Sequence, residues 1–316
     1  MRHFTALSDV EDFPGLLHRA QEIKKNPFHK NHLGKFKTLG LVFFNASLRT
    51  RLSTQKAAQN LGLSVIVLNV TADSWKMETE MGVVMNADKA EHIKDAIGVM
   101  GLYCDIIGVR AFANLTDQEE DYSEQILLSF VQYAGIPVVS LESAIRHPLQ
   151  SFADLITIEE YRRKNHPKVV LTWAPHPKAL PQAVANSFVE WIKALDCEFV
   201  VTHPKGYELA PEFSREVHIE YDQNKALEDA DFVYVKNWSS YTHYGQVLSQ
   251  DIDWMVTPEK MQLTNQGYFM HCLPVRRNVV VSDAVIDGAQ SLVLPQAANR
   301  VFSAQAVLEA ILEHNF

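Results

Sequence analysis

At residues 43–51 the chain reads Phe43-Phe44-Asn45-Ala46-Ser47-Leu48-Arg49-Thr50-Arg51, an apolar segment that runs directly into a polar one. The apolar part is typical of a buried strand and the polar part of a helix start. A helix N-terminus offers unpaired backbone N–H donors and a positive dipole end, so it attracts phosphate. Ser47 is a plausible cap for this helix, and Arg49 and Arg51 add charge-assisted donors. From this segment alone, a phosphate cradle and an ordinary capped helix with solvated arginines remain equally good interpretations.

Short apolar runs alternate with helical patterns on both sides of this segment, which indicates an α/β protein with mostly parallel sheets. In the first half we predict strands at 38–45, 64–70, 105–111 and 137–142, and helices near 50–62, 89–103 and 123–134. After a helix at 151–163, we predict further strands at 168–173, 198–203, 217–221, 231–236, 268–273 and 291–294. A last helix is expected from Ser303, as its cap, to His314. The pattern predicts two doubly wound domains.

The composition excludes several classes of protein. The 316 residues are 47% hydrophobic and 21% charged, which suits a globular chain with room for two domains. The net charge of -9 opposes binding to nucleic acid or to anionic membranes. Three cysteines without metal-ligand spacing indicate neither disulfides nor zinc, and fit a reducing cytoplasm. We expect no metal, no signal peptide and no membrane span.

Two further motifs carry polar chemistry at predicted strand ends, where open parallel sheets place their ligands. The first is His147-Pro148-Leu149-Gln150, whose imidazole and amide suit a carbonyl and an amide, although an interdomain linker is an equally good interpretation. The second runs from His271 through Cys272 and Leu273 to Asn278. A lone cysteine there is more often a small buried hydrophobe. The adjacent Arg276 and Arg277 favour a functional role, because tandem arginines at a strand end are costly unless solvated or paired with anions.

Together the three motifs resemble those of the transcarbamylase family: Ser-x-Arg-Thr-Arg at 47–51, His-Pro-x-Gln at 147–150 and His-Cys-Leu-Pro at 271–274. The resemblance extends over the whole chain and implies a carbamoyltransferase that uses carbamoyl phosphate. It implies that the following residues bind carbamoyl phosphate: Ser47, Leu48, Arg49, Thr50, Trp75, Arg110, His147, Gln150, Cys272, Leu273 and Arg300. Of these, it gives catalytic roles to Thr50, Arg110, His147 and Cys272. It implies no cofactor.

The resemblance also implies an organisation. Residues 1–145 with the terminal helix 300–316 would form the carbamoyl phosphate-binding domain, and 146–299 the domain that binds an acylated amino acid. Trp75 would reach the site of a neighbouring subunit, commonly in a homotrimer. The loop near 174–184 would lie against the loop near 237–253 in a knotted chain, although general fold rules make knots rare.

The sequence of the predicted second domain indicates which substrate accepts the carbamoyl group. The Asp-x-x-x-Ser-Met-Gly stretch typical of ornithine transcarbamylases is absent, which demotes free ornithine to an alternative. The chain more closely resembles acylornithine transcarbamylases, in which Glu142, His176, Lys236 and Arg276 would hold the acylated substrate. At the position that separates acetyl-type from succinyl-type enzymes, Ala90 matches neither the acidic residue nor the proline. The surrounding residues favour N-succinylornithine over N-acetylornithine, in arginine biosynthesis.

Two other classes of function remain as alternatives. A non-catalytic sensor of a phosphorylated metabolite could use the same α/β frame. The carbonyl and amide contacts implied for His147 and Gln150 argue against it, because a phosphate binder does not need them. A nucleotide-dependent oxidoreductase would fit the strand pattern, but the sequence has neither a GxGxxG nor a Walker-type motif.

Overall fold

A computed structural model describes all 316 residues of the chain and divides them into two compact units. Unit 1 comprises Met1–Ala113, Glu119–Leu149 and Arg300–Phe316. Unit 2 comprises Asn114–Gln118 and Gln150–Asn299. Each unit is an α/β structure built on a parallel sheet, so the predicted fold class is confirmed at this level.

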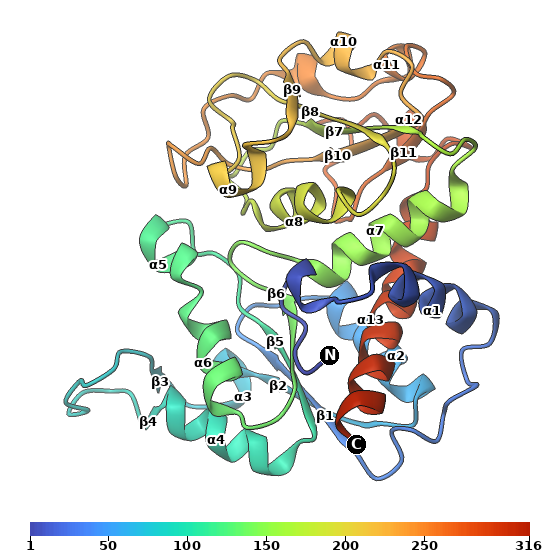
Figure 1. Ribbon diagram of the computed structural model, residues 1–316. Coiled ribbons are helices and arrows are strands. Elements are labelled where there is room, and N and C mark those ends of the chain that lie inside the picture. The colour runs from blue at the N-terminus through green and yellow to red at the C-terminus, as the bar shows by residue number, and fades with distance from the viewer. The chain divides into compact units, whose positions relative to one another are not determined.

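The sheet of unit 1 has four strands in the order β2-β1-β5-β6, and every pair is parallel. The strands are β1 (Thr38–Phe43), β2 (Ser64–Asn69), β5 (Ile106–Arg110) and β6 (Val138–Glu142). In Figure 1, α4 (Ile93–Tyr103) and α6 (Gln125–Tyr133) lie on one side of this sheet, and α2 (Arg49–Asn60) on the other. All five residues of β5 are buried, which explains why the four that precede Arg110 carry no polar side chain. The parallel arrangement brings the carboxyl ends of all four strands to one edge.

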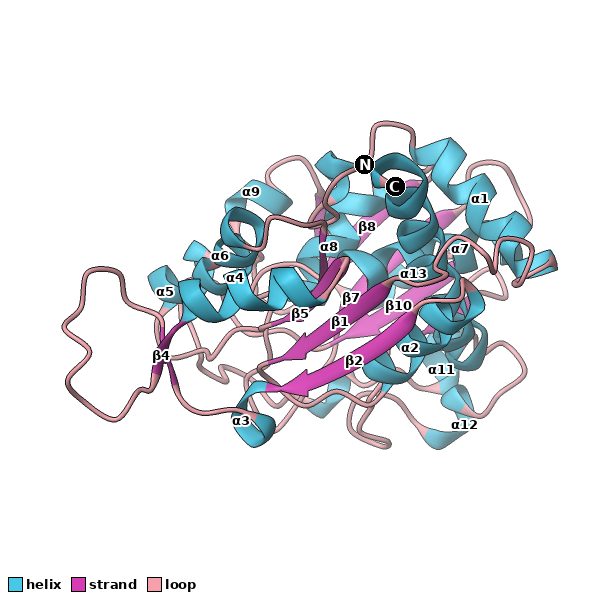
Figure 2. Cartoon of the chain, turned by 90° about the horizontal axis from the view of Figure 1, so that it is seen from below, coloured by secondary structure: helices cyan, strands magenta, loops and turns pink.

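The smaller elements of unit 1 include a long exposed connection. They are η1 (Leu7–Asp9), α1 (Phe13–Lys25), α3 (Val70–Asp73), β3 (Met77–Glu78), β4 (Glu91–His92) and α5 (Gln118–Ser123), whose first residue belongs to unit 2. The short strands β3 and β4 pair in parallel, and the chain between them extends outward as an open loop (Figure 2). This loop exposes four apolar side chains, those of Met81, Val83, Val84 and Met85. Such a surface is typical of a protein-protein contact.

The sheet of unit 2 has five parallel strands in the order β11-β10-β7-β8-β9. Its strands are β7 (Lys168–Trp173), β8 (Glu198–Thr202), β9 (His218–Glu220), β10 (Phe232–Lys236) and β11 (Tyr268–Met270). Its helices are α7 (Pro148–Tyr161), α8 (Ala183–Ile192), α9 (Pro211–Ser214), α10 (Gln223–Leu227), η2 (Ile252–Trp254), α11 (Pro258–Met261) and α12 (Asp283–Ile286). The first two residues of α7 belong to unit 1.

The predicted strand at 291–294 is wrong. Ser291 forms only an isolated bridge with Phe269, and α13 (Val293–Asn315) begins two residues later. A short apolar run cannot by itself distinguish a strand from a buried helix. Pro295 is compatible with the helix because it lies in the first turn, where its missing N–H has no intrahelical acceptor.

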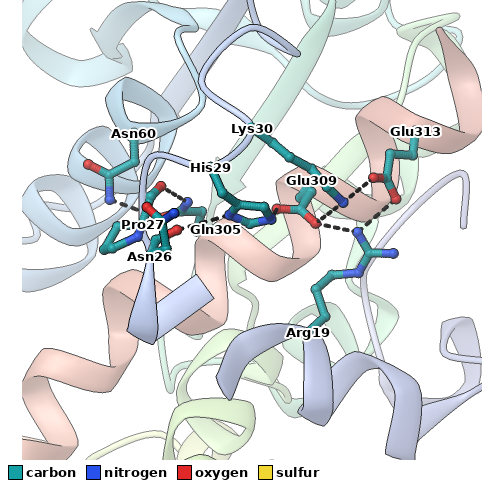
Figure 3. A network of polar contacts seen from close by, with 9 residues as sticks. All are labelled: Arg19, Asn26, Pro27, His29, Lys30, Asn60, Gln305, Glu309 and Glu313. Atoms are coloured by element: carbon teal, nitrogen blue, oxygen red, sulfur yellow. Dashed lines mark hydrogen bonds and ion pairs between the residues drawn. The ribbon is translucent and has the colours of Figure 1, made fainter. Parts of the chain in front are cut away.

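The terminal helix α13 also begins ten residues before the predicted start at Ser303. Ser303 is therefore not a cap, and its hydroxyl instead donates to the carbonyl oxygen of Leu149. Further along the helix, the buried carboxylate of Glu309 accepts from Arg19 at 2.5 Å and from Lys30 at 2.8 Å (Figure 3). The amide of Gln305 bonds Asn60 and the carbonyl oxygen of Pro27. These contacts fix the C-terminal part of α13 within unit 1.

Two irregular stretches of unit 2 contact each other. The Asn237 side chain donates to the carbonyl oxygen of Ala174 at 2.7 Å. The backbone N–H of Ser239 donates to the carbonyl oxygen of Leu180 at 2.9 Å. Gln182 adds a 2.8 Å bond to the carbonyl oxygen of Ser239. Long loops held together by buried polar contacts are ordered structure, and such loops often carry function.

None of the helices combines the length and the apolar character that crossing a membrane would require.

Candidate functional site

The turn between β1 and α2 leaves the N-terminus of α2 without a side-chain cap. The helix begins at Arg49, its N-cap is Leu48, and no side chain donates or accepts at that cap. The expectation that Ser47 caps the helix is therefore wrong, since the helix starts one residue too late for it. Asn45 instead stabilises the turn, because its side-chain oxygen accepts from the backbone N–H of Phe112 at 3.0 Å. The first-turn N–H groups of α2 thus have no side-chain cap to compete with an anion.

Arg110 connects this turn to the end of β6. One guanidinium nitrogen donates to the carbonyl oxygens of Asn45 and Ala46, both at 2.9 Å. The other two nitrogens donate to the same carboxylate oxygen of Glu142, at 3.0 and 2.8 Å. His147 lies beside them, with its Nε2 atom 3.9 Å from that oxygen. Since Arg110 and His147 are both buried, these groups meet with little competition from water.

Arg300 joins the same region from the far end of the sequence. Its guanidinium donates to the hydroxyl of Thr50 at 2.7 Å, and both side chains are buried. Unit 1 therefore brings two arginines and a helix N-terminus to the carboxyl ends of β1 and β5. This combination is chemically suited to a phosphate or a developing oxyanion.

In unit 2, Gln150 of the His-Pro-x-Gln motif and the His-Cys-Leu-Pro segment at 271–274 lie in one buried polar cluster. His271 accepts the backbone N–H of Leu273 on its Nδ1 atom at 2.8 Å, which fixes the neutral ring tautomer. Leu273 has a positive φ of 55°, uncommon for leucine, and the peptide to Pro274 is cis. A positive φ at a leucine often marks a functional site.

Tyr234 of β10 lies within this cluster. Burial, followed by the nearby Asp154 and Cys272, raises the pKa of Tyr234 well above its usual value. The side chain is therefore a neutral phenol at physiological pH.

The second cluster of unit 2 contains His176 and Arg276. The Arg276 Nε–H donates to Nε2 of His176 at 3.0 Å, and Nδ1 of His176 lies 2.8 Å from the carbonyl oxygen of Lys178. Burial is the main cause that lowers the pKa of His176, and the positive charges of Arg276 and Lys236 lower it further. The hydrogen bond to the carbonyl oxygen of Lys178 raises the pKa but does not offset these effects. Lys236, at the end of β10, contributes through its charge. His176, Lys236 and Arg276 thus form one group, whereas Glu142 lies beside Arg110 in unit 1.

The structure separates the tandem arginines. Arg277 forms ion pairs with Asp283 at 2.8 Å and Asp287 at 2.6 Å on the surface. Its role is therefore structural, and only Arg276 joins the candidate site.

Trp75 is 59% exposed, and its indole N–H donates to Glu91 at 2.9 Å at the base of the β3–β4 loop.

Sequence reasoning missed Asp154 and Gln296. Asp154 is a fully buried carboxylate that accepts from Gln150 and from Gln296 on the same oxygen, each at 2.7 Å. One signal was present: an aspartate stands between the apolar Ala153 and Leu155, four residues after a candidate site residue on one helix face. No comparable signal marks Gln296.

The comparisons with known proteins agree with this arrangement. Residues 2–160 match the carbamoyl-P binding domain of aspartate/ornithine carbamoyltransferase, and residues 181–311 match the Asp/Orn binding domain of the same family. The chain therefore belongs to the aspartate/ornithine carbamoyltransferase family.

Within that family the chain is more similar to acylornithine carbamoyltransferases than to the ornithine carbamoyltransferase of Listeria monocytogenes, with which it shares 29% identity. The chain is 58% identical to the N-succinylornithine carbamoyltransferases of Bacteroides thetaiotaomicron and Bacteroides fragilis, over 99% of both chains in each case. It is 34% identical to the N-acetylornithine carbamoyltransferase of Xanthomonas campestris pv. campestris, over 99% of this chain and 98% of that one.

A solved structure is also similar throughout. It is a variant of N-acetyl-L-ornithine transcarbamylase with one glutamate replaced by alanine, complexed with carbamyl phosphate and N-succinyl-L-norvaline. The TM-score is 0.93 at 34% identity, over 98% of this chain and 100% of that one.

Proposed function

We propose that the chain transfers the carbamoyl group of carbamoyl phosphate to the side-chain amine of N-succinylornithine, giving N-succinylcitrulline and phosphate in arginine biosynthesis. The observation that carries the proposal is the 58% identity, over nearly the whole chain, to enzymes named for that substrate. The cationic turn of unit 1 and the cationic cluster of unit 2 supply chemistry suited to the two anionic substrates.

Carbamoyl phosphate would be held mainly by the β1–α2 turn. Its phosphate would accept from the N–H of the N-cap Leu48 and the first-turn N–H groups of α2, and from the side chains of Ser47, Arg49, Thr50 and Arg300. Its carbonyl oxygen would accept from Thr50, Arg110 and His147. Its NH₂ group would donate to Gln150 and to the backbone near Cys272 and Leu273. Support comes from the burial of Thr50, Arg110 and Arg300 and from their fixed contacts, which lower the cost of organising them around a ligand.

The mechanism we propose is direct attack by the neutral amine on the carbamoyl carbon. A C–N bond forms, an oxyanion develops on the carbonyl oxygen, and the C–O bond to phosphate then breaks. Each preorganised donor to that oxygen is worth about 2.7–4 kcal/mol, by analogy with an oxyanion hole. The departing phosphate can take the amine proton, so the scheme assigns no protein side chain as general base.

His176, Lys236 and Arg276 would hold the acylated amino acid. Lys236 and Arg276 suit its carboxylates, and neutral His176 orients Arg276. Glu142 would accept from the acyl amide or from the amine, while the same carboxylate orients Arg110. Cys272 would line the site without forming a covalent intermediate.

The succinyl acceptor is favoured over the acetyl one by Ala90 and by the relatives. A glutamate at this position would repel the extra carboxylate of a succinyl group, and alanine does not. The solved relative that binds N-succinyl-L-norvaline carries a glutamate-to-alanine change, although its wild type is named for the acetyl substrate.

Assembly and topology complete the proposal. The exposed apolar β3–β4 loop and the exposed Trp75 suit a homotrimer in which Trp75 enters a neighbouring site. We also propose that each domain is doubly wound and that the chain is knotted, with 174–184 against 237–253. The contacts between these two loops are compatible with the knot.

The test is a parallel assay of purified protein with carbamoyl phosphate and N-succinylornithine, N-acetylornithine or free ornithine. Formation of N-succinylcitrulline above the other two products is the expected result. Preferential formation of free citrulline would indicate an ornithine carbamoyltransferase instead. Binding of carbamoyl phosphate without turnover of any acceptor would indicate a sensor.

A further inference from the structure

Unit 2 contains a buried polar network in which Asp154 and Gln296 have no role in the proposed function. Asp154 lies on α7, Gln296 in the first turn of α13, and His271 at the end of β11. Asp154, Gln296, Gln150 and His271 are all at most 2% exposed. Burying an ionisable carboxylate among these groups is costly unless hydrogen bonds compensate for the lost water. The position of Asp154 therefore calls for an explanation beyond packing.

One oxygen of Asp154 organises two glutamine amides. Its Oδ1 atom accepts from Nε2 of Gln150 at 2.7 Å and from Nε2 of Gln296 at 2.7 Å. A carboxylate can only accept, so both amides must present their nitrogen ends to it. The amide oxygen of Gln150 then points away from Asp154, so a ligand N–H that bonds this oxygen meets it at the end of the amide opposite Asp154.

The second amide extends the network to the His-Cys-Leu-Pro segment. With its nitrogen bonded to Asp154, Gln296 presents its oxygen to the backbone N–H of His271 and accepts from it at 2.9 Å. The His271 ring in turn accepts the N–H of Leu273 at 2.8 Å. The two segments proposed to contact the carbamoyl nitrogen are therefore oriented by one charge.

We propose that Asp154 is a positioning residue that, through Gln150 and Gln296, makes the site an acceptor for the carbamoyl NH₂ group. A carbamoyl NH₂ donates two hydrogen bonds, so a site that receives it must present oxygen atoms. Asp154 fixes the Gln150 amide in the orientation that does so. The inference rests on the proposed use of carbamoyl phosphate and adds a residue that does not touch the substrate.

The test is a double-mutant cycle that pairs Asp154→Leu with Gln150→Ala. Leucine has a similar shape and no acceptor, so the Gln150 amide loses its fixed orientation. We expect Asp154→Leu to lower kcat/KM for carbamoyl phosphate by about 10- to 100-fold, with a smaller change in KM for the acylated substrate. In the Gln150→Ala background the same change should have less than about a threefold further effect.

Asp231→Asn is the matched control. Asp231 is a buried carboxylate of unit 2 that accepts from Lys164 and from the backbone N–H of Lys168, which begins β7, at the opposite end of the strands. Its loss should lower the melting temperature and leave kcat/KM unchanged. Because Asp154→Leu removes a buried group and could unfold the chain, Asp154→Asn serves as a milder second variant. It retains an acceptor oxygen without the charge, and we expect a loss between wild type and leucine.

The outcomes separate this inference from the proposed function. Wild-type binding of carbamoyl phosphate, measured by calorimetry, tests the function independently of Asp154. If the wild type binds and turns over, and folded Asp154→Leu and Asp154→Asn match it, the positioning role is wrong. Losses that are fully additive with Gln150→Ala would also overturn it, because Asp154 would then act independently of that amide.

Discussion

Arg300 and Thr50 are 250 residues apart in the sequence, yet the guanidinium of Arg300 donates to the hydroxyl of Thr50 at 2.7 Å. The bond joins α13 to the first turn of α2 inside a buried environment. It fixes an arginine beside the open helix start, so that a bound phosphate would not have to order a flexible side chain.

Replacement of Arg300 by glutamine tests this relationship. We expect kcat/KM for carbamoyl phosphate to fall by about 10²–10³-fold, comparable to the loss of one oxyanion-hole donor. KM for the acylated substrate should change much less. Initial-rate kinetics with each substrate varied in turn provide the measurement, and Arg162→Gln, at an exposed position just after α7, is the control. Equal changes in both KM values would contradict the assignment.

The ion pair between Arg110 and Glu142 leads to a second prediction. The two guanidinium contacts to Glu142 orient Arg110, while Glu142 is itself proposed to hold the acceptor. Glu142→Gln should therefore raise KM for both substrates and lower kcat by about tenfold, because a charge-assisted hydrogen bond is roughly twice as strong as a neutral one.

Steady-state kinetics of this variant can be compared with Glu159→Gln, which removes only the pairing with Arg162. An effect on the acylated substrate alone would mean that Arg110 does not depend on Glu142 for its orientation.

The contact between His176 and Arg276 predicts a pH dependence. Only neutral His176 can accept the Arg276 N–H, and burial together with the adjacent positive charges lowers the pKa of His176 below its usual 6.5. The contact is thus intact at neutral pH. The contribution of this depressed pKa to folding stability is present above pH 6.5 and is lost as the pH falls through the folded-state pKa.

We therefore expect KM for the acylated substrate to rise as the pH falls below about 6.5, with little change in KM for carbamoyl phosphate at the same pH. His176→Asn should remove this difference between the two pH profiles. A profile in the variant that is identical to that of the wild type would show that another group titrates.

The contacts of α13 predict that Glu309 and Glu313 contribute differently to the free energy of unfolding. Glu309 is almost fully buried and pairs with Arg19 and Lys30, whereas Glu313, which pairs with the same two residues, is about one-third exposed (Figure 3). Glu309→Gln should destabilise the protein by about 2–4 kcal/mol, because it removes a buried charge that the partly exposed Arg19 and Lys30 both contact. Glu313→Gln should cost less than about 1 kcal/mol, as exposed pairs do. Urea unfolding of the two variants measures the difference, and equal losses would contradict the role of burial.

The sequence predicted the strands of both sheets well, because parallel strands covered on both faces read as continuous apolar runs. It failed where a local pattern is ambiguous. Residues 291–294 look like a strand, but Ser291 forms only one bridge and the chain then enters α13. The start of α13 was missed for the same reason.

The site was predicted only as far as its motifs reach. Thr50, His147 and Cys272 were found because each lies in a recognisable segment at a strand end. The bond between Asp154 and Gln296 joins residues 142 positions apart, and neither position carries a motif. Such partners depend on how helices pack across a core, which a local pattern does not encode. The capping role expected for Ser47 failed on a shift of one residue, within the usual uncertainty of helix boundaries.

The last prediction concerns how Ala90 affects the choice between succinylated and acetylated ornithine. Ala90 lies exposed at the end of the β3–β4 loop, where its backbone N–H donates to the carbonyl oxygen of Lys76 at 3.0 Å. Because that contact uses only the backbone, the side chain can be changed without removing it. Ala90→Glu should lower kcat/KM for N-succinylornithine by at least about tenfold relative to N-acetylornithine, since the new carboxylate would repel the succinyl carboxylate. Ala90→Gln, of the same shape without the charge, should retain the wild-type preference. If the two variants shift the preference equally, steric bulk rather than charge decides the acyl group at this position.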